Sequence, residues 1–214
     1  MNSAEVRQKH KLHLFPSVAN FYEEPAVLVE GKGTRLKDLD GNSYLDFFGG
    51  ILTVSLGHAN EEVNGAVIEQ LGRLAHVSTL YPTVPIVELA EKLSQVTPGK
   101  LEKCFFTASG TEADETAVML AQVYTGNMEL IGLRHGYSGR SALAQALTAH
   151  SGYRAVPTQV ASIKHAVAPY CYRCPFKLDP KDCGTACADD VEDVIRTTTT
   201  GKIAGMLAEP IMGV

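Results

Sequence analysis

A serine, a glycine and a threonine stand where a short apolar run gives way to a helical pattern. Cys104-Phe105-Phe106-Thr107 indicates a strand, and Ser109-Gly110-Thr111 precedes a helix expected over residues 111–124. The start of a helix offers free backbone N–H groups and the positive end of the helix dipole, and the two hydroxyls add further donors. This combination suits a phosphate group, although a serine or threonine that merely caps a helix gives the same pattern.

A glycine-flanked tyrosine follows the next expected strand, in the segment Arg134-His135-Gly136-Tyr137-Ser138-Gly139-Arg140. Flanking glycines let the backbone approach a ligand closely, and the flat ring of Tyr137 is suited to stacking on a planar heterocycle. An ordinary glycine loop that contains a tyrosine is the alternative. His135 adjoins this tyrosine, but neither His135 nor His58 is expected to act as a catalytic base.

An acidic residue ends a third strand. Glu209-Pro210 follows the run of residues 203–208, and open α/β sheets bind their ligands at the carboxyl ends of strands. Glu209 is therefore a candidate ligand contact. A helix cap or a salt-bridge partner would be equally compatible with a single acid at this position.

Four of the five cysteines form two pairs, Cys171/Cys174 and Cys183/Cys187, with eight residues between the pairs. Four thiolates at this spacing could hold a structural zinc ion. Free thiols are the favoured interpretation, with zinc and a disulfide as alternatives, so no metal is assigned. Cys104 is expected to be a small core residue in its strand.

The elements that must position these residues follow from hydrophobic periodicity. Short strands joined by Gly and Asp-Gly turns predict an antiparallel meander before residue 56. Asn60 is placed to cap one helix, and Pro85 opens a second that ends by Pro98-Gly99. Beyond residue 101, apolar runs alternate with helical patterns, which indicates a sheet with crossover helices. The expected strands are 27–30, 35–39, 43–47, 104–107, 130–133, 160–164 and 203–208, with a last helix over 188–197.

Composition narrows the classes of partner. The formal net charge is −5 and the pI about 5.8, and no segment clusters Lys and Arg, so neither nucleic acid nor an anionic membrane is an expected partner. The chain shows no signal-peptide pattern and no apolar run long enough to span a bilayer. A cytoplasmic protein with small-molecule partners is expected, and its cysteines should be reduced.

The motifs taken together in this order resemble class III aminotransferases, enzymes of fold type I that depend on pyridoxal 5'-phosphate (PLP). This family includes 4-aminobutyrate, acetylornithine and type 2 alanine-glyoxylate aminotransferases. Besides the segments above, the resemblance is carried by 40–47, Leu56-Gly57-His58 and 81–90. It implies an α/β PLP-transferase fold that is incomplete: a segment at 1–56 with the antiparallel meander, and at 57–214 the first part of the large PLP-binding domain with a mainly parallel sheet.

The resemblance also implies residue roles. Ser109-Gly110-Thr111 matches the phosphate cradle and Tyr137 the aromatic that stacks on the cofactor ring. Glu209 lies by the substrate in the family and pairs in many members with an arginine, and Gly50-Ile51 falls where the N-terminal segment approaches the substrate. Two residues depart from the family pattern, Asp114 in place of Asn and Ser138 in place of His.

No catalytic residue is assigned within the chain. The Schiff-base lysine and the aspartate that pairs with the pyridine nitrogen lie, in the family, beyond the position matching Val214. No lysine here, including Lys164 and Lys202, has a matching context. PLP chemistry needs both groups, so the chain by itself is expected to be inactive.

The resemblance therefore indicates the N-terminal half of an enzyme that transfers an amino group from an amino acid or ω-amino donor to a 2-oxo acid. The full-length form is expected to be a homodimer. One alternative is a non-catalytic chain that acts only with a partner polypeptide. The other is an aminomutase or racemase of the same fold.

Overall fold

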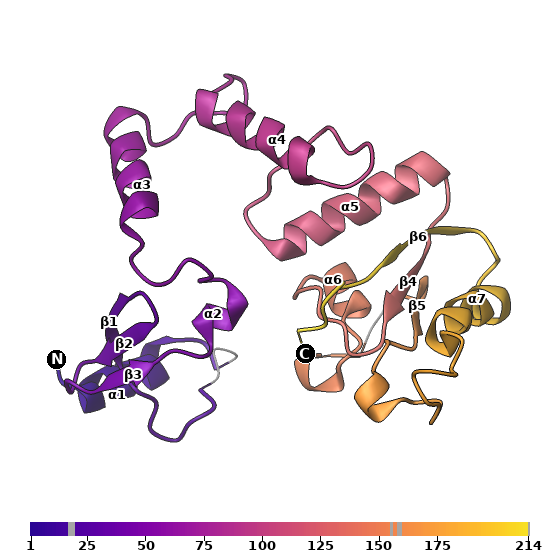
Figure 1. The fold of residues 1–214 in the computed structure, drawn as a ribbon, viewed down its shortest axis with the longest axis horizontal. Helices are drawn as coiled ribbons and strands as arrows, with labels where there is room; N and C mark the ends of the chain where they lie inside the picture. Colours follow the sequence, from indigo (N-terminus) through magenta and orange to yellow (C-terminus); the bar gives the residue numbers. More distant parts are fainter. Residues whose placement is uncertain (17–19, 155, 158–159, 214) are drawn as a thin grey trace. The chain divides into compact units, whose positions relative to one another are not determined.

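The computed structural model describes residues 1–16, 20–154, 156–157 and 160–213. The chain divides into two compact units, residues 1–88 and 89–214 (Figure 1). The boundary predicted after residue 56 refers to domains of the complete fold and not to these two units, so it stays a prediction.

The first unit is built on the predicted antiparallel meander. Strands β1 (Leu28–Lys32), β2 (Arg35–Asp38) and β3 (Ser43–Leu45) pair in sequence order. A buried Asp38 stabilises the turn between the last two strands, because its carboxylate accepts the backbone N–H of Asn42 at 2.7 Å and the hydroxyl of Tyr44 at 2.6 Å.

Four helices of the described chain precede or follow this sheet along the sequence. They are α1 (Ser3–His13), the short α2 (Gly49–Leu52), α3 (Glu61–Arg73) and α4 (Val84–Val96), in which the boundary between the units falls. The predicted cap of α3 is confirmed, since the side-chain oxygen of Asn60 accepts the N–H of Val63 at 3.0 Å. Helix α1 was not expected, although a capping box between Asn2 and Glu5 marks its start.

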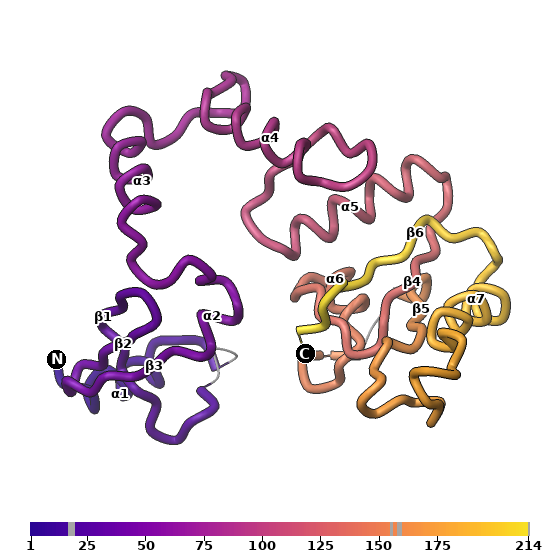
Figure 2. Tube along the Cα trace, viewed as in Figure 1, coloured from indigo at the N-terminus to yellow at the C-terminus, as the bar shows by residue number. Residues whose placement is uncertain are grey.

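The second unit contains a parallel sheet with helices on both faces. Its strands are β4 (Glu129–Leu133), β5 (Ile163–Ala166) and β6 (Ile203–Leu207), in the order β5-β4-β6. Figure 2 traces the crossovers between them, through α6 (Ala142–Leu147) and α7 (Ala186–Thr198). Helix α5 (Gly110–Thr125) leads into β4, and the single-turn 3-10 helices η1 (Ser151–Tyr153) and η2 (Cys171–Arg173) lie in connections.

Alternating side chains of β4 supply two separate hydrophobic cores. Leu130 faces α5 and α6, where it packs with Val118 and Leu147. Ile131 and Leu133 face the opposite side and pack with residues of α7. A parallel strand that is apolar on both faces must be covered on both, and the apolar run of β4 indicates this arrangement.

The predicted strand at residues 104–107 is wrong for this structure. The segment belongs to no ladder among the described residues, and the exposed fraction of Phe105 is 75%. Cys104 is likewise exposed, not a core residue, and its thiol donates to the carbonyl oxygen of Ala90 at 3.7 Å. Pairing defines a strand, so an apolar run without a neighbouring strand stays an extended loop.

Candidate cofactor and substrate site

Ser109 caps helix α5. Its side-chain oxygen accepts the N–H of Glu112 at 3.2 Å, and the carboxylate of Glu112 accepts the N–H of Ala108 at 2.8 Å. The capping alternative is therefore correct for the Ser109 side chain. This cap leaves other backbone N–H groups of the first helical turn without an acceptor in the described part of the chain.

The amides of Gly110 and Thr111 have no hydrogen-bond partner among the residues that the structure describes. They stand at the positive end of a 16-residue helix. A β-carbon built on Gly110 would meet no atom within 4 Å, so a side chain could be added at this position without a clash. Free N–H groups and a helix dipole fit a phosphate group.

Gly139 brings the tyrosine loop against this turn. A β-carbon placed on Gly139 would lie 2.1 Å from Oγ1 of Thr111 and 2.9 Å from its Cβ, and Gly139 has a φ of +126°. Only glycine allows both this backbone conformation and this contact. The structure thus places two of the segments singled out in the sequence, the Ser109 turn and the Tyr137 loop, side by side.

Contacts with Tyr153, Thr148 and Glu209 hold the Tyr137 loop in place. The ring of Tyr137 meets the ring of Tyr153 edge to face, with 5.5 Å between centroids and an angle of 71°. The N–H of Ser138 donates to Oγ1 of the fully buried Thr148 at 2.9 Å. The N–H of Tyr137 donates to Oε1 of Glu209 at 2.8 Å.

Glu209 ties together the loops that follow β4 and β6. Its second oxygen, Oε2, accepts the N–H of Gly213 at 3.0 Å. Both carboxylate oxygens therefore bind backbone N–H groups, and no arginine or lysine pairs with Glu209 within the described part of the chain. Burial and, secondly, the negative charge of Glu209 raise the pKa of Asp114 above its usual value.

Gly50 and Ile51 lie in the first unit, in a turn with left-handed backbone. Gly49, Gly50, Ile51 and Leu52 all have φ between +57° and +62°. Left-handed backbone costs a residue with a side chain about 1–2 kcal/mol, so Ile51 and Leu52 hold an unfavourable conformation. Such strain is concentrated at functional sites.

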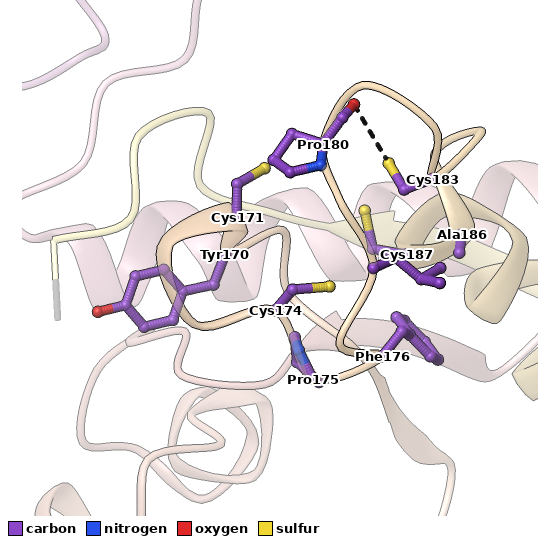
Figure 3. Close-up of a pocket in the computed structure, with 10 residues that line it drawn as sticks. Tyr170, Cys171, Cys174, Pro175, Phe176, Pro180, Cys183, Ala186 and Cys187 are labelled. Atoms are coloured by element: carbon purple, nitrogen blue, oxygen red, sulfur yellow. Dashed lines mark hydrogen bonds between the residues drawn. The ribbon is translucent and has the colours of Figure 1, made fainter.

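The four clustered cysteines line one small cavity of about 30 Å³ (Figure 3). All are free thiols, and none of the candidate cofactor residues lines this cavity. The backbone N–H groups of Leu178, Phe176 and Lys177 lower the pKa of Cys174, against an opposing effect of burial. In the described ranges, no group of three or more His, Cys, Asp or Glu side chains is arranged to hold a metal ion.

Thr148 and Tyr153 were not expected from the sequence to belong to this site. They contact Ser138 and Tyr137, from which they are separated by helix α6, and no local pattern marks them. Gly139 was expected only as a glycine flanking Tyr137, and its contact with Thr111 is a finding of the structure. No helix among the described residues is long and apolar enough to cross a membrane.

Known proteins are similar to this chain in sequence and fold. An alanine-glyoxylate aminotransferase 2 homologue from Arabidopsis thaliana, described as mitochondrial, is 40% identical over 209 residues, which are 98% of this chain and 43% of that protein. An (S)-enantioselective ω-transaminase from Thermomicrobium roseum superposes with a TM-score of 0.84 at 31% identity, covering 99% of this chain and 50% of the other. A PLP-bound amine transaminase from an uncultivated Pseudomonas species superposes with a TM-score of 0.82 at 25% identity, covering 94% and 48%.

The chain spans about half the length of these relatives. The sequence profile of the family described as aminotransferase class-III matches residues 18–214. That match covers the meander, the Ser109 turn, the Tyr137 loop and Glu209. The chain therefore belongs to the class-III aminotransferases, a PLP-dependent family of α/β fold.

Proposed function

We propose that the protein transfers an amino group from an amino acid or ω-amino donor to a 2-oxo acid with PLP as cofactor. The observation that carries the proposal is the contact of Gly139 with Thr111. It joins a helix start with unpartnered amides to a loop that carries a half-buried tyrosine ring, so that a phosphate and an aromatic ring can be held by one site.

Each residue has a binding or positioning role in this proposal. The amides of Gly110 and Thr111 hold the cofactor phosphate, and the Ser109 side chain keeps the turn in place through its cap. The ring of Tyr137 stacks on the cofactor ring, with Tyr153 against its edge. PLP, when bound, supplies an electron sink for the amino-transfer chemistry.

The proposal gives substrate roles separately to Glu209 in the second unit and to Gly50-Ile51 in the first unit. Glu209 holds the Tyr137 loop through the backbone, so its effect on the substrate acts first through the placement of that loop. The exposed Ile51 offers an apolar contact to an amino donor, with an exposed fraction of 69%.

We further propose that the 214-residue chain alone does not catalyse the reaction. Lys164 in β5 donates to the carbonyl oxygen of Ala161, at the amino end of that strand. The Tyr137 loop and Glu209 follow the carboxyl ends of β4 and β6, and parallel strands place those ends at the opposite edge of the sheet. Lys164 therefore points away from the proposed site. The proposal includes a homodimeric, cytoplasmic full-length enzyme.

Substitution of Gly110 by Val tests the phosphate cradle. Because a β-carbon there meets open space, the added side chain should leave the fold intact and block only a ligand that approaches the amides. PLP retention is measured by absorbance after exhaustive dialysis of the full-length protein, together with amino transfer from alanine or 4-aminobutyrate to a 2-oxo acid.

The matched control is Gly72→Val, at a position that is also helical and open but lies in α3 of the first unit. We expect Gly110→Val to lose PLP and Gly72→Val to keep it. Retention of PLP by Gly110→Val would overturn the cradle assignment. Racemisation or migration of the amino group without transfer to the oxo acid would favour the racemase or aminomutase alternative.

A further inference from the structure

Segment 47–57 of the first unit is an apolar loop with exposed side chains. Phe47, Leu52 and Leu56 have exposed fractions of 90%, 75% and 72%. The loop contains the left-handed turn of residues 49–52, whose φ values between +57° and +62° suit glycine but not Ile51 or Leu52. A turn of this kind persists only where surrounding bonds hold it.

Bonds within the turn, such as that from the N–H of Thr53 to the carbonyl oxygen of Gly49 at 2.9 Å, are supplemented at the start of the loop by the carboxylate of Asp46. Oδ1 of Asp46 accepts the N–H of Phe48 at 2.8 Å and the N–H of Gly49 at 2.9 Å. These are the two amides that lead directly into the left-handed residues. Hydrogen bonds to an ionised acceptor are stronger than bonds between neutral groups.

The second oxygen of the same carboxylate reaches the end of the loop. Oδ2 of Asp46 lies 2.6 Å from Nε2 of His58. Both side chains are shielded, with exposed fractions of 8% for Asp46 and 23% for His58. The Asp46 carboxylate therefore contacts the first residues of segment 47–57 and the residue that follows the segment.

The loop base is also anchored to the β1–β2 turn. His58 and Gly33 exchange two backbone hydrogen bonds, of 2.8 Å and 2.9 Å, and the N–H of Asp46 donates to the carbonyl oxygen of Thr34 at 2.8 Å. A β-carbon on Gly31 would lie 2.9 Å from the His58 side chain, so the His58 side chain packs directly against the backbone of β1. We call the contacts of Asp46 with Phe48, Gly49 and His58 the clamp. The β1–β2 sheet holds the clamp in place, whereas the apolar loop is exposed.

From this arrangement we infer that Asp46 is a positioning residue of the amino-donor site. Its carboxylate joins the two ends of segment 47–57 and holds the left-handed turn in the conformation that presents Gly50 and Ile51. The inference rests on the proposed function, because the placement of Gly50 and Ile51 affects catalysis only if they face the substrate.

The first test measures the clamp without cofactor, substrate or catalysis. Hydrogen exchange of the Phe48 and Gly49 amides is followed in the purified full-length protein and in Asp46→Ala. We expect at least about tenfold faster exchange at these two amides, which corresponds to the loss of one hydrogen bond. Chymotrypsin, which cleaves after Phe and Leu, should also cut the loop faster.

Matched variants separate the clamp from general damage. Asp40→Ala removes an exposed carboxylate from the β2–β3 turn of the same unit and should leave exchange and cleavage unchanged. Asp46→Asn keeps an oxygen for the Phe48 and Gly49 amides and should restore most of their protection. Exchange of the Leu36 and Lys37 amides in β2 reports whether the sheet is intact in each variant.

The second test asks whether the clamp serves the substrate. In Asp46→Ala, KM for the amino donor should rise at least about tenfold while PLP retention is unchanged, and Asp46→Asn should recover part of the loss. Unchanged protection of Phe48 and Gly49 in Asp46→Ala would overturn the proposal, and so would faster exchange with unaltered KM. If the wild-type protein neither bound PLP nor transferred amino groups while Asp46→Ala still lost protection, the proposed function would fail and the clamp would stand.

Discussion

Substituting Gly139 with Ala perturbs a contact that joins the Ser109 turn to the Tyr137 loop. The added β-carbon would lie 2.1 Å from Oγ1 of Thr111, whereas ordinary contact begins at 3.4 Å, so about 1.3 Å of separation is needed (3.4 minus 2.1). Rotation of the Thr111 hydroxyl does not suffice, because the Cβ of Thr111 is also too close, at 2.9 Å. The backbones of the loop and the helix start must move apart.

The magnitude follows from two costs. A φ of +126° is essentially reserved for glycine, and holding alanine there costs about 1–3 kcal/mol. The overlap costs a similar amount, about 1–3 kcal/mol, as in other overpacked sites. If the loop separates to relieve about 2 kcal/mol, PLP binding weakens by about 30-fold. Titration of the apo form of the full-length protein with PLP, followed by absorbance, measures this change.

The control for this substitution is Gly201→Ala. Gly201 also has a positive φ, +79°, but an added β-carbon there meets no atom within 4 Å. This variant therefore carries backbone strain without the overlap, and its PLP affinity should stay near that of the wild type. Equal PLP affinities for Gly139→Ala, Gly201→Ala and the wild type would refute the reasoning that the contact of Gly139 with Thr111 assembles the site.

Four further predictions concern single groups. Tyr137→Phe should keep PLP affinity within about twofold, because its phenyl ring preserves both the stacking and the contact with Tyr153. Tyr137→Ala removes the ring and should weaken PLP affinity by at least about tenfold. Absorbance after dialysis compares PLP retention by the two variants. Glu209→Gln should lower the pKa of Asp114 toward its ordinary value by removing a like charge, which NMR titration can detect. The His58 side chain, followed by the N–H groups of Gly49 and Phe48, lowers the pKa of Asp46 to about 2. The ionised Asp46 therefore stabilises the fold fully above pH 3.8, and this contribution is lost as the pH falls through about 2. Acid unfolding of Asp46→Ala should lack this pH-dependent contribution. Borohydride reduction of the 214-residue chain mixed with PLP should label no single lysine stoichiometrically, as peptide mapping would show, and one fully labelled lysine would contradict the assignment of the chain as inactive.

Local patterns were sufficient to predict most of the elements and the start of α5 at the Ser109 turn, whereas the phosphate role of that turn stays a prediction. Asn60 and Ser109 bind backbone N–H groups within their own helices, and such caps depend only on residues three positions away. The doubly apolar β4 likewise predicts a strand covered on both faces. In each case the physical cause is contained in a few consecutive residues.

Only the tertiary structure decided which distant residues meet. The apolar run at residues 104–107 has the composition of a strand but no ladder partner in the described chain, and pairing cannot be read from composition. Glu209 binds the amide of Tyr137, 72 residues earlier, and Gly139 lies against Thr111 because β4 and α5 are placed by the shared core around Leu130. The sequence by itself determined the donors of the site, while packing determined their common location, because contacts between separate elements depend on how the hydrophobic core arranges them.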